Sequence, residues 1–142
     1  GLRGADTIRG LAGNDGLEGG VGADTLKGGA GRDQLEGGSG GDALVGGAGN
    51  DMLTDNIGTE FTEDPSGPAD NDTLIAGGGN DFLGFANGRD DVHAGVGDDR
   101  LRTQADGLVD TINCGPGDDR LVYYFADDPN DVIRGCEHVV VR

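Results

Sequence analysis

The chain has few of the residues that build an ordinary hydrophobic core. Its 142 residues include no tryptophan, 4% are aromatic and 34% are hydrophobic, whereas 31 are glycine. A chain of this composition buries too little apolar surface to fold by hydrophobic burial alone, so a disordered linker rich in glycine and aspartate is one interpretation. The length is that of one domain, which we expect to span residues 1–142.

Positive charge is also scarce. Ten Lys and Arg residues stand against 27 Asp and Glu residues, so the formal net charge is −17. We expect no nucleic-acid partner, because the sequence shows no basic stripe that could meet phosphates. We also expect no membrane span, because no apolar run approaches the roughly 20 residues that a spanning helix needs. No signal-peptide pattern is visible, which leaves the secretion route open.

A nine-residue repeat argues against disorder. Six units follow one another over residues 1–54, namely GLRGADTIR, GLAGNDGLE, GGVGADTLK, GGAGRDQLE, GGSGGDALV and GGAGNDMLT. Each unit has Asp at its sixth position and Ile or Leu at its eighth. A strict short period predicts a stacked solenoid, in which each unit buries its apolar residue against its neighbours. The eighth positions should face inward, and the seventh and ninth positions outward.

The sixth-position acids would stack as a column of carboxylates, which needs a counter-cation. Calcium takes six to eight oxygen ligands, and glycines at positions one, two and four would let the backbone curl so that carbonyl groups converge on an ion. The predicted aspartate ligands are Asp6, Asp15, Asp24, Asp33, Asp42, Asp51, Asp72, Asp81, Asp90, Asp99 and Asp119. The predicted glycine ligands are Gly4, Gly13, Gly19, Gly20, Gly22, Gly28, Gly29, Gly31, Gly37, Gly46, Gly77, Gly79, Gly95 and Gly97.

The amount of calcium follows from the charge. About eight Ca²⁺ ions would bring about 16 positive charges, nearly cancelling the net charge of −17. We expect the chain to be disordered without calcium and to fold on binding it, because binding energy then becomes folding energy.

The repeat is interrupted and then resumes. Residues 55–66 form an insert or a degenerate repeat, residues 67–122 a second repeat block, and residues 123–142 a C-terminal cap. We favour a degenerate unit, in which Phe61 faces inward and Asp72 lies one coil above Asp51; in the alternative, a surface loop, Asp72 lies above Asp42. In the second block, Leu108 replaces a turn glycine, which makes a calcium-binding turn before Asp110 doubtful.

These units resemble the G-G-x-G-x-D-x-U-x consensus of the RTX, or haemolysin-type, calcium-binding repeat. The resemblance implies an all-β right-handed parallel β-roll with two units per coil, a six-residue turn and a three-residue strand in each unit. It implies that calcium lies between turns of units n and n+2. One such site would join Gly20, Gly22 and Asp24 to Gly37, Ser39 and Asp42. Residues 101–139 also resemble the C-terminal end of secreted calcium-binding repeat proteins of actinobacteria and related groups.

The chain has two cysteines, Cys114 and Cys136, which are 22 residues apart. This is slightly more than one 18-residue coil, and one coil rises about 4.8 Å, close to the roughly 5.5–6 Å between the Cα atoms of a disulfide. We therefore predict a disulfide, with two buried free thiols as the alternative. A disulfide would indicate an oxidising compartment and an extracellular or cell-surface location. It also departs from RTX toxins and proteases, which are nearly free of cysteine.

No catalytic constellation is visible, so we expect no enzyme. The adjacent acidic pairs, such as Asp90–Asp91, should each provide one ligand and one solvated side chain. His93 and His138 lack the spacing of a zinc site. The sequence predicts a monomeric calcium-binding structural module of a secreted or cell-surface protein, with a larger parent polypeptide as a candidate partner. The alternative is a carrier or secretion-type RTX domain of an extracellular hydrolase or adhesin.

Overall fold

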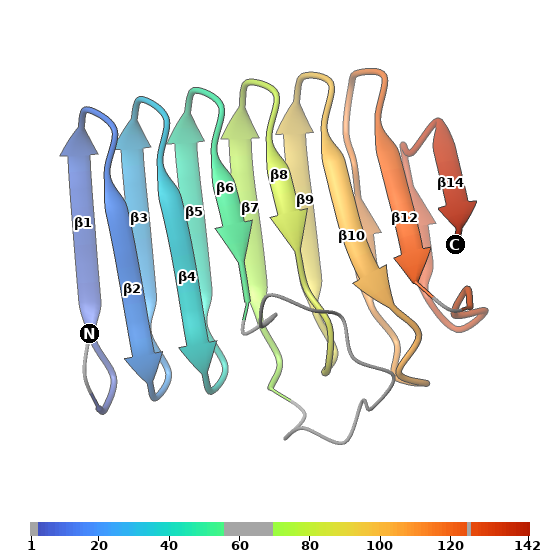
Figure 1. Ribbon diagram of the computed structural model, residues 1–142, viewed down its shortest axis with the longest axis horizontal. Coiled ribbons are helices and arrows are strands. Elements are labelled where there is room, and N and C mark those ends of the chain that lie inside the picture. The colour runs from blue at the N-terminus through green and yellow to red at the C-terminus, as the bar shows by residue number, and fades with distance from the viewer. Residues whose placement is uncertain (1–2, 56–69, 125) are drawn as a thin grey trace.

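The chain folds into a parallel β-solenoid with two seven-stranded sheets. The computed structural model describes residues 3–55, 70–124 and 126–142. Consecutive strands alternate between the sheets, so each coil has two strands and two turns (Figure 1). No helix occurs in the described ranges, and hence none that is long and apolar enough to cross a membrane. The all-β fold with two repeat units per coil is therefore confirmed.

Each sheet takes every second strand. The first sheet contains β1 (Thr7–Ala12), β3 (Thr25–Ala30), β5 (Ala43–Ala48), β7 (Thr73–Gly78), β9 (Asp91–Val96), β11 (Thr111–Asn113) and β13 (Val132–Arg134). The second sheet contains β2 (Gly16–Val21), β4 (Gln34–Ser39), β6 (Met52–Thr54), β8 (Phe82–Gly84), β10 (Arg100–Gln104), β12 (Arg120–Tyr124) and β14 (His138–Val141).

The strands stack in the register of the repeat. Leu26 pairs with Leu44, and Leu44 with Leu74, so equivalent positions of successive coils lie side by side. The regular strands are longer than the three residues expected from the resemblance. β3, for example, has six residues and continues through position three of the next unit. The turn is correspondingly short, because backbone pairing between β3 and β5 continues beyond the ninth position. Gly29 and Gly47, at position two of their units, are still strand partners.

Eighth-position residues form the core, as predicted. Leu26, Leu44 and Leu74 are completely buried, whereas Arg9 and Lys27 at ninth positions are exposed. The buried eighth-position residues are Leu26, Leu35, Leu44, Leu53, Leu74, Leu83, Val92, Leu101, Ile112 and Leu121. First positions also face inward, since alternation along the strand returns every second residue to the same side. The repeat pattern alone predicts turn residues at these positions and does not predict that they face the core.

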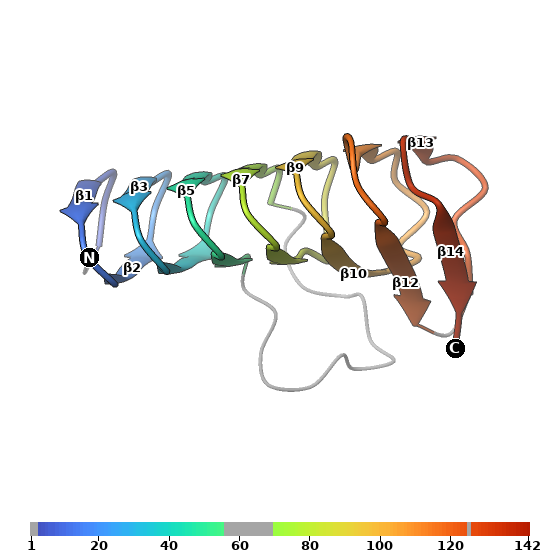
Figure 2. The same ribbon diagram turned by 90° about the horizontal axis from the view of Figure 1, so that it is seen from above.

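The C-terminal half of the roll has a larger core than the N-terminal half. First positions hold glycine in the early coils but are filled later, and their buried side chains there are Ala76, Phe85, Ala94, Thr103, Cys114 and Tyr123. Coils also lengthen, from the 18 residues between Asp24 and Asp42 to the 20 between Asp90 and Asp110. Seen from above, the ribbon widens toward the C-terminus (Figure 2). The coils around Cys114 and Tyr123 are thus both longer and bulkier inside, whereas Phe85 lies in an 18-residue coil between Asp72 and Asp90.

The favoured phase for the interruption is wrong. Asp72 lies above Asp42, whose backbone N–H donates to Asp72 Oδ1 at 2.6 Å, and β7 pairs with β5. The two aspartates are 30 residues apart rather than the usual 18, so 12 extra residues enter one half-coil. A solenoid keeps its stacking register because backbone pairing and the inward leucines fix it, whereas a turn accepts added residues. Phe61 lies outside the described residues.

The C-terminal residues continue the roll instead of closing it with a separate cap. β13 pairs with β11 and β14 pairs with β12, in the same parallel register as the earlier coils. β14, which includes Val139–Val141, is the last strand of the second sheet. Val139 and Val141 are each 48% exposed, so they cover little of the open end, whereas Tyr123 is fully buried in the core.

Candidate metal centre

Acidic side chains collect in two columns, one along each edge where the chain turns from sheet to sheet. The first column precedes the strands of the first sheet and consists of Asp6, Asp24, Asp42, Asp72, Asp90, Asp110 and Asp131. The second column precedes the strands of the second sheet and consists of Asp15, Asp33, Asp51, Asp81, Asp99, Asp119 and Glu137. All eleven predicted aspartates lie in these columns.

Hydrogen bonds orient the carboxylates of both columns from Asp24 and Asp33 onward. The backbone N–H of Asp24 donates to Asp42 Oδ1 at 2.8 Å, and that of Asp33 donates to Asp51 Oδ1 at 2.9 Å. The same bond recurs from coil to coil along both edges. It uses one carboxylate oxygen and turns the other toward the inside of the turn.

That second oxygen is the chemically informative atom. Ten buried Oδ2 atoms in the described part of the chain have no hydrogen-bond partner, and they belong to Asp15, Asp24, Asp33, Asp42, Asp51, Asp72, Asp81, Asp90, Asp99 and Asp119. An unsatisfied buried polar atom costs about 1–3 kcal/mol, and more when it is charged. Ten such atoms together would cost as much as, or more than, the about 5–15 kcal/mol that stabilises a typical domain. The roll therefore needs cations, or protons, at these oxygens.

The turn backbone adds oxygens that fit a calcium ion. Gly20 O and Gly22 O face the coil above, since a Cβ atom on Gly38 or Gly40 would overlap them. Gly37 O faces the coil below in the same way, toward Gly19. Ser39 O also points down and accepts the N–H of Gly22 at 2.8 Å. Carbonyl and carboxylate oxygens from two stacked turns thus converge, which is the hard, oxygen-only donor set of calcium.

The predicted glycines serve two different purposes. Those at positions two and four have positive φ angles, such as 108° at Gly20 and 136° at Gly22, as expected for a turn that exposes carbonyls. This group comprises Gly4, Gly13, Gly20, Gly22, Gly29, Gly31, Gly77, Gly79, Gly95 and Gly97.

Glycines at position one have no positive φ, which corrects the reason given for them. Gly19, Gly28, Gly37 and Gly46 are buried and face inward. A Cβ atom on Gly37 would lie 2.5 Å from Asp42 Oδ2. Position one is therefore small because the carboxylate five residues later occupies the space beside it.

Burial makes the carboxylates reluctant to ionise without a metal. It raises the pKa of Asp72 to about 8, with a further contribution from the nearby Asp55 charge. Burial likewise raises the pKa of Asp110 to about 8, that of Asp90 to about 7 and that of Asp81 to about 6. A bound cation would favour the ionised forms, so metal and protons compete at these groups.

Sequence reasoning missed several acids of the first column. Asp110 is 1% exposed, accepts the N–H of Asp90 at 3.0 Å and donates its own N–H to Asp131 at 2.9 Å. Its turn lacks the consensus glycine, which is why it was considered doubtful. The signal that remained was the spacing, since Asp110–Ile112 and Asp131–Ile133 keep the offset of positions six and eight.

Three further aspartates replace turn carbonyls in the same column. In regular turns the position-four N–H donates to a carbonyl, as Gly22 does to Ser39 O. In later coils a carboxylate accepts that bond instead, Asp70 from Gly40 at 2.9 Å and Asp106 from Gly88 at 2.8 Å. Asp128 likewise accepts the N–H of Gly107, at position three of its unit, at 2.8 Å. The first column thus becomes richer in carboxylates where its turns depart from the consensus.

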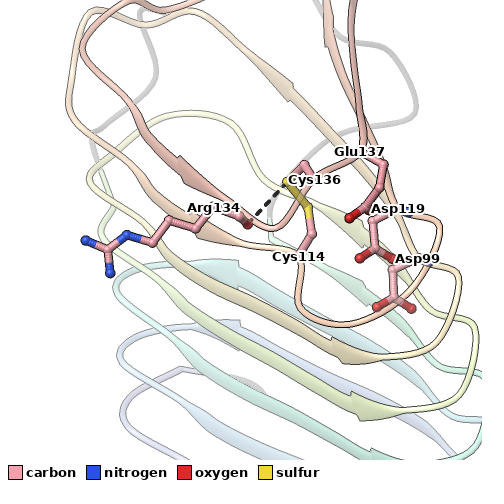
Figure 3. Close-up of a disulfide and its surroundings, with 6 residues drawn as sticks. All are labelled: Asp99, Cys114, Asp119, Arg134, Cys136 and Glu137. Carbon is pink, nitrogen blue, oxygen red and sulfur yellow. Dashed lines mark hydrogen bonds between the residues drawn. A yellow bond between two sulfur atoms is a disulfide. The ribbon is translucent and has the colours of Figure 1, made fainter.

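A disulfide joins the last two coils, as predicted. Cys114 and Cys136 are bonded, and their Cα atoms are 5.1 Å apart. Figure 3 shows the bond beside the upper end of the second column, where Asp99, Asp119 and Glu137 are stacked. Cys114 occupies an inward first position and is completely buried. The disulfide therefore fixes the coil that ends the column.

The histidines take no part in these columns. His93 pairs with Asp91 at 3.1 Å, and His138 pairs with Asp118 at 3.0 Å. In both pairs the side chains are more than 40% exposed. His93 is the ninth residue of its unit, so its surface pair agrees with the outward direction expected at ninth positions.

Comparison with known proteins gives the same assignment as the geometry. The family model of the RTX calcium-binding nonapeptide repeat matches four times, at residues 1–26, 18–53, 66–92 and 86–107, and these matches cover more than half of the chain. No curated protein and no solved structure matches it. The stacked carboxylates, the glycine turns and the family match agree, and the chain belongs to the RTX calcium-binding nonapeptide repeat family.

Proposed function

We propose that this chain is a structural module of a secreted or cell-surface protein that folds when it binds several calcium ions. The observation that carries the proposal is the set of ten buried carboxylate oxygens without a hydrogen-bond partner. The free-energy cost of burying these oxygens without a partner opposes folding of the metal-free chain. Calcium removes that cost and couples binding to folding.

We assign the ions to the gaps between stacked turns. One site takes Gly20 O, Gly22 O and the Asp24 carboxylate from one turn. From the next turn it takes Gly37 O, Ser39 O and the Asp42 carboxylate, all of which face or border the same gap. The equivalent site in the second column joins Gly29, Gly31 and Asp33 to Gly46, Ala48 and Asp51. About eight such ions would offset most of the negative charge.

The proposed location follows from calcium supply and redox chemistry. Extracellular calcium-binding modules have dissociation constants of about 0.1–1 mM, which suits a protein that folds only outside the cell. The Cys114–Cys136 disulfide also favours an oxidising compartment. We propose that the module acts as a monomer and stiffens a larger polypeptide to which it is joined.

Circular dichroism tests calcium-dependent folding. In a chelator at neutral pH the spectrum should be that of a disordered chain, and millimolar calcium should convert it to a β-rich spectrum. Magnesium at the same concentration should substitute poorly, because it requires a tight octahedral shell and retains its waters. A β-rich spectrum in chelator, unchanged by calcium, would reject the proposal.

A further inference from the structure

Asp55 is an aspartate at an inward first position, where the coils below and above have a glycine and a phenylalanine. Asp55 follows the last residue of β6, and its N–H donates to Gly84 O at 3.0 Å, so it continues the ladder of the second sheet. In that sheet Thr54 pairs with Glu36 and with Gly84. Asp55 therefore stands at the inward first position, between Gly37 below and Phe85 above. It is only 4% exposed.

Asp55 meets two carboxylates of the first column. Asp42, Asp55 and Asp72 each place a carboxylate oxygen within 4.8 Å of the others. Two ligands on opposite sides of a calcium ion are about 4.6–5.2 Å apart, twice the metal–oxygen distance. The three oxygens are therefore close enough together to bind one ion.

Two of these side chains also have an unused ligand atom. Asp42 and Asp72 are 3% and 2% exposed, and the Oδ2 atom of each has no hydrogen-bond partner. Asp70 adds charge beside them, since its carboxylate accepts the N–H of Gly40 in the turn that ends at Asp42. Among the described residues, no Lys, Arg or His forms an ion pair with Asp42 or Asp72, since the two histidine pairs involve Asp91 and Asp118.

We propose that Asp42, Asp55 and Asp72 bind a calcium ion in a carboxylate-rich site outside the nonapeptide rule, and that this ion joins the two ends of the insertion to the roll. Asp55 and Asp70 are the described residues on either side of residues 56–69, and Asp72 follows Asp70 by two residues. The Asp55 carboxylate, which belongs to no regular unit, provides oxygens beside those of Asp42 and Asp72. This site rests on the proposal that the roll folds with calcium.

Calcium suits this site better than magnesium does. Magnesium keeps several waters in its shell, and side chains that are 2–4% exposed leave little access for them. Three carboxylates also provide more negative charge than the two carboxylates of a regular gap. We therefore expect this ion to be the last to leave when calcium is lowered.

The test compares calcium stoichiometry in full-length wild type and two variants by native mass spectrometry across a calcium titration. Asp55→Asn keeps the shape of the side chain and removes its charge. Asp127→Asn is the matched control, because Asp127 is exposed and lies outside both columns. We expect Asp55→Asn to bind about one ion fewer at limiting calcium, and Asp127→Asn to match wild type.

A second measurement keeps the test valid if Asp55→Asn does not fold. Crystals of the wild type grown with calcium should show an anomalous-scattering peak between the three carboxylates. The site would be overturned if wild type and Asp55→Asn bound the same number of ions with the same midpoint in the calcium titration. It would also be overturned if no anomalous peak lay between the three carboxylates. Either result would leave calcium-dependent folding intact. Failure of the wild type to bind any calcium would overturn this site together with the proposed function.

Discussion

At the scale of single residues, the roll depends on glycines that no other residue can replace in the same way. Gly31 has φ 136°, and a Cβ atom there would overlap the carbonyl of Gly13 in the coil below. Gly37 has ordinary φ and is small because of Asp42 Oδ2. The repeat consensus shows all of these positions as glycine, and only the structure separates the conformational requirement from the steric one.

Gly31→Ala should destabilise the calcium-loaded roll by about 1–3 kcal/mol, because a non-glycine residue must adopt this backbone conformation. Gly78→Ala is the control, since Gly78 has no positive φ and a Cβ atom there would meet nothing within 4 Å. Thermal unfolding in saturating calcium measures both. Equal melting temperatures for the two variants would contradict the assigned role of Gly31.

The buried carboxylates predict a pH dependence for the metal-free chain. Burial raises the pKa of Asp72 and Asp110 to about 8 and that of Asp90 to about 7. A folded-state pKa above the unfolded value near 3.8 gives stability that is fully present below the unfolded pKa and is lost as pH rises through the folded pKa. The metal-free roll should therefore gain stability as pH falls from about 8 to about 4.

Circular dichroism from pH 8 to pH 4 checks this. The metal should be removed beforehand on an ion-exchange resin, because a chelator binds calcium poorly once acid protonates it. We expect β content to rise on acidification without calcium and the calcium affinity to fall over the same range. A metal-free spectrum that stays disordered from pH 8 to pH 4 would show that protons do not replace calcium at these oxygens.

At the scale of elements, the two columns behave as ladders in which interior members have two neighbours. Asp24 accepts the N–H of Asp6 at 2.7 Å and donates its own N–H to Asp42 at 2.8 Å. Asp6 begins the same ladder. We propose that an interior carboxylate borders two calcium gaps and a terminal one borders a single gap.

Asp24→Ala should thus lose about two ions and Asp6→Ala about one, at saturating calcium. Native mass spectrometry counts the ions in each variant. Equal losses from the two variants would mean that the carboxylates do not bridge neighbouring gaps.

We expect the disulfide to stabilise the last coils of the roll. Closing a loop of about 20 residues stabilises by roughly 3 kcal/mol in the chain-entropy model. Cys136 is bonded to Cys114, and in the same part of the roll the Tyr123 hydroxyl donates to Asp131 Oδ2 at 2.6 Å. Reduction should loosen the chain after Arg120 and leave residues 3–54 unchanged, because solenoid units depend mainly on their neighbours.

Hydrogen exchange with and without reductant, in saturating calcium, measures this difference. Peptides from the first six repeats serve as the internal control. Protection after Arg120 that survives reduction would show that the ladder, and not the disulfide, secures the last coils.

The sequence could predict the elements that obey the period and could not predict those that break it. The inward leucines, the parallel stacking and the eleven column aspartates follow from fixed offsets. The stacking of Asp72 after the interruption does not follow from the period. The intervening chain is long enough to place Asp72 above either Asp51 or Asp42, and only the pairing of β7 with β5 distinguishes the two arrangements. Asp55 was missed for the same reason: it belongs to no repeat, and its place beside Asp42 and Asp72 depends on how the chain resumes.

At the scale of the whole molecule, we expect bound calcium to be part of the fold. The hydrophobic core is one row of aliphatic side chains per sheet, mostly leucines, with added bulk near the C-terminus, while the chain carries a net charge of −17. Without cations the columns would repel along the whole length of the roll. The chain should therefore become compact when calcium is added, whereas a change in temperature or in protein concentration alone should not compact it.

Small-angle X-ray scattering measures compaction most directly. At neutral pH in chelator the radius of gyration should be near 39 Å, the value for an unfolded chain of this length, and in saturating calcium it should fall to about 15 Å. Intermediate calcium should give a mixture of the two populations. A radius near 15 Å in chelator, unchanged by calcium, would contradict the claim that calcium ions hold this roll together.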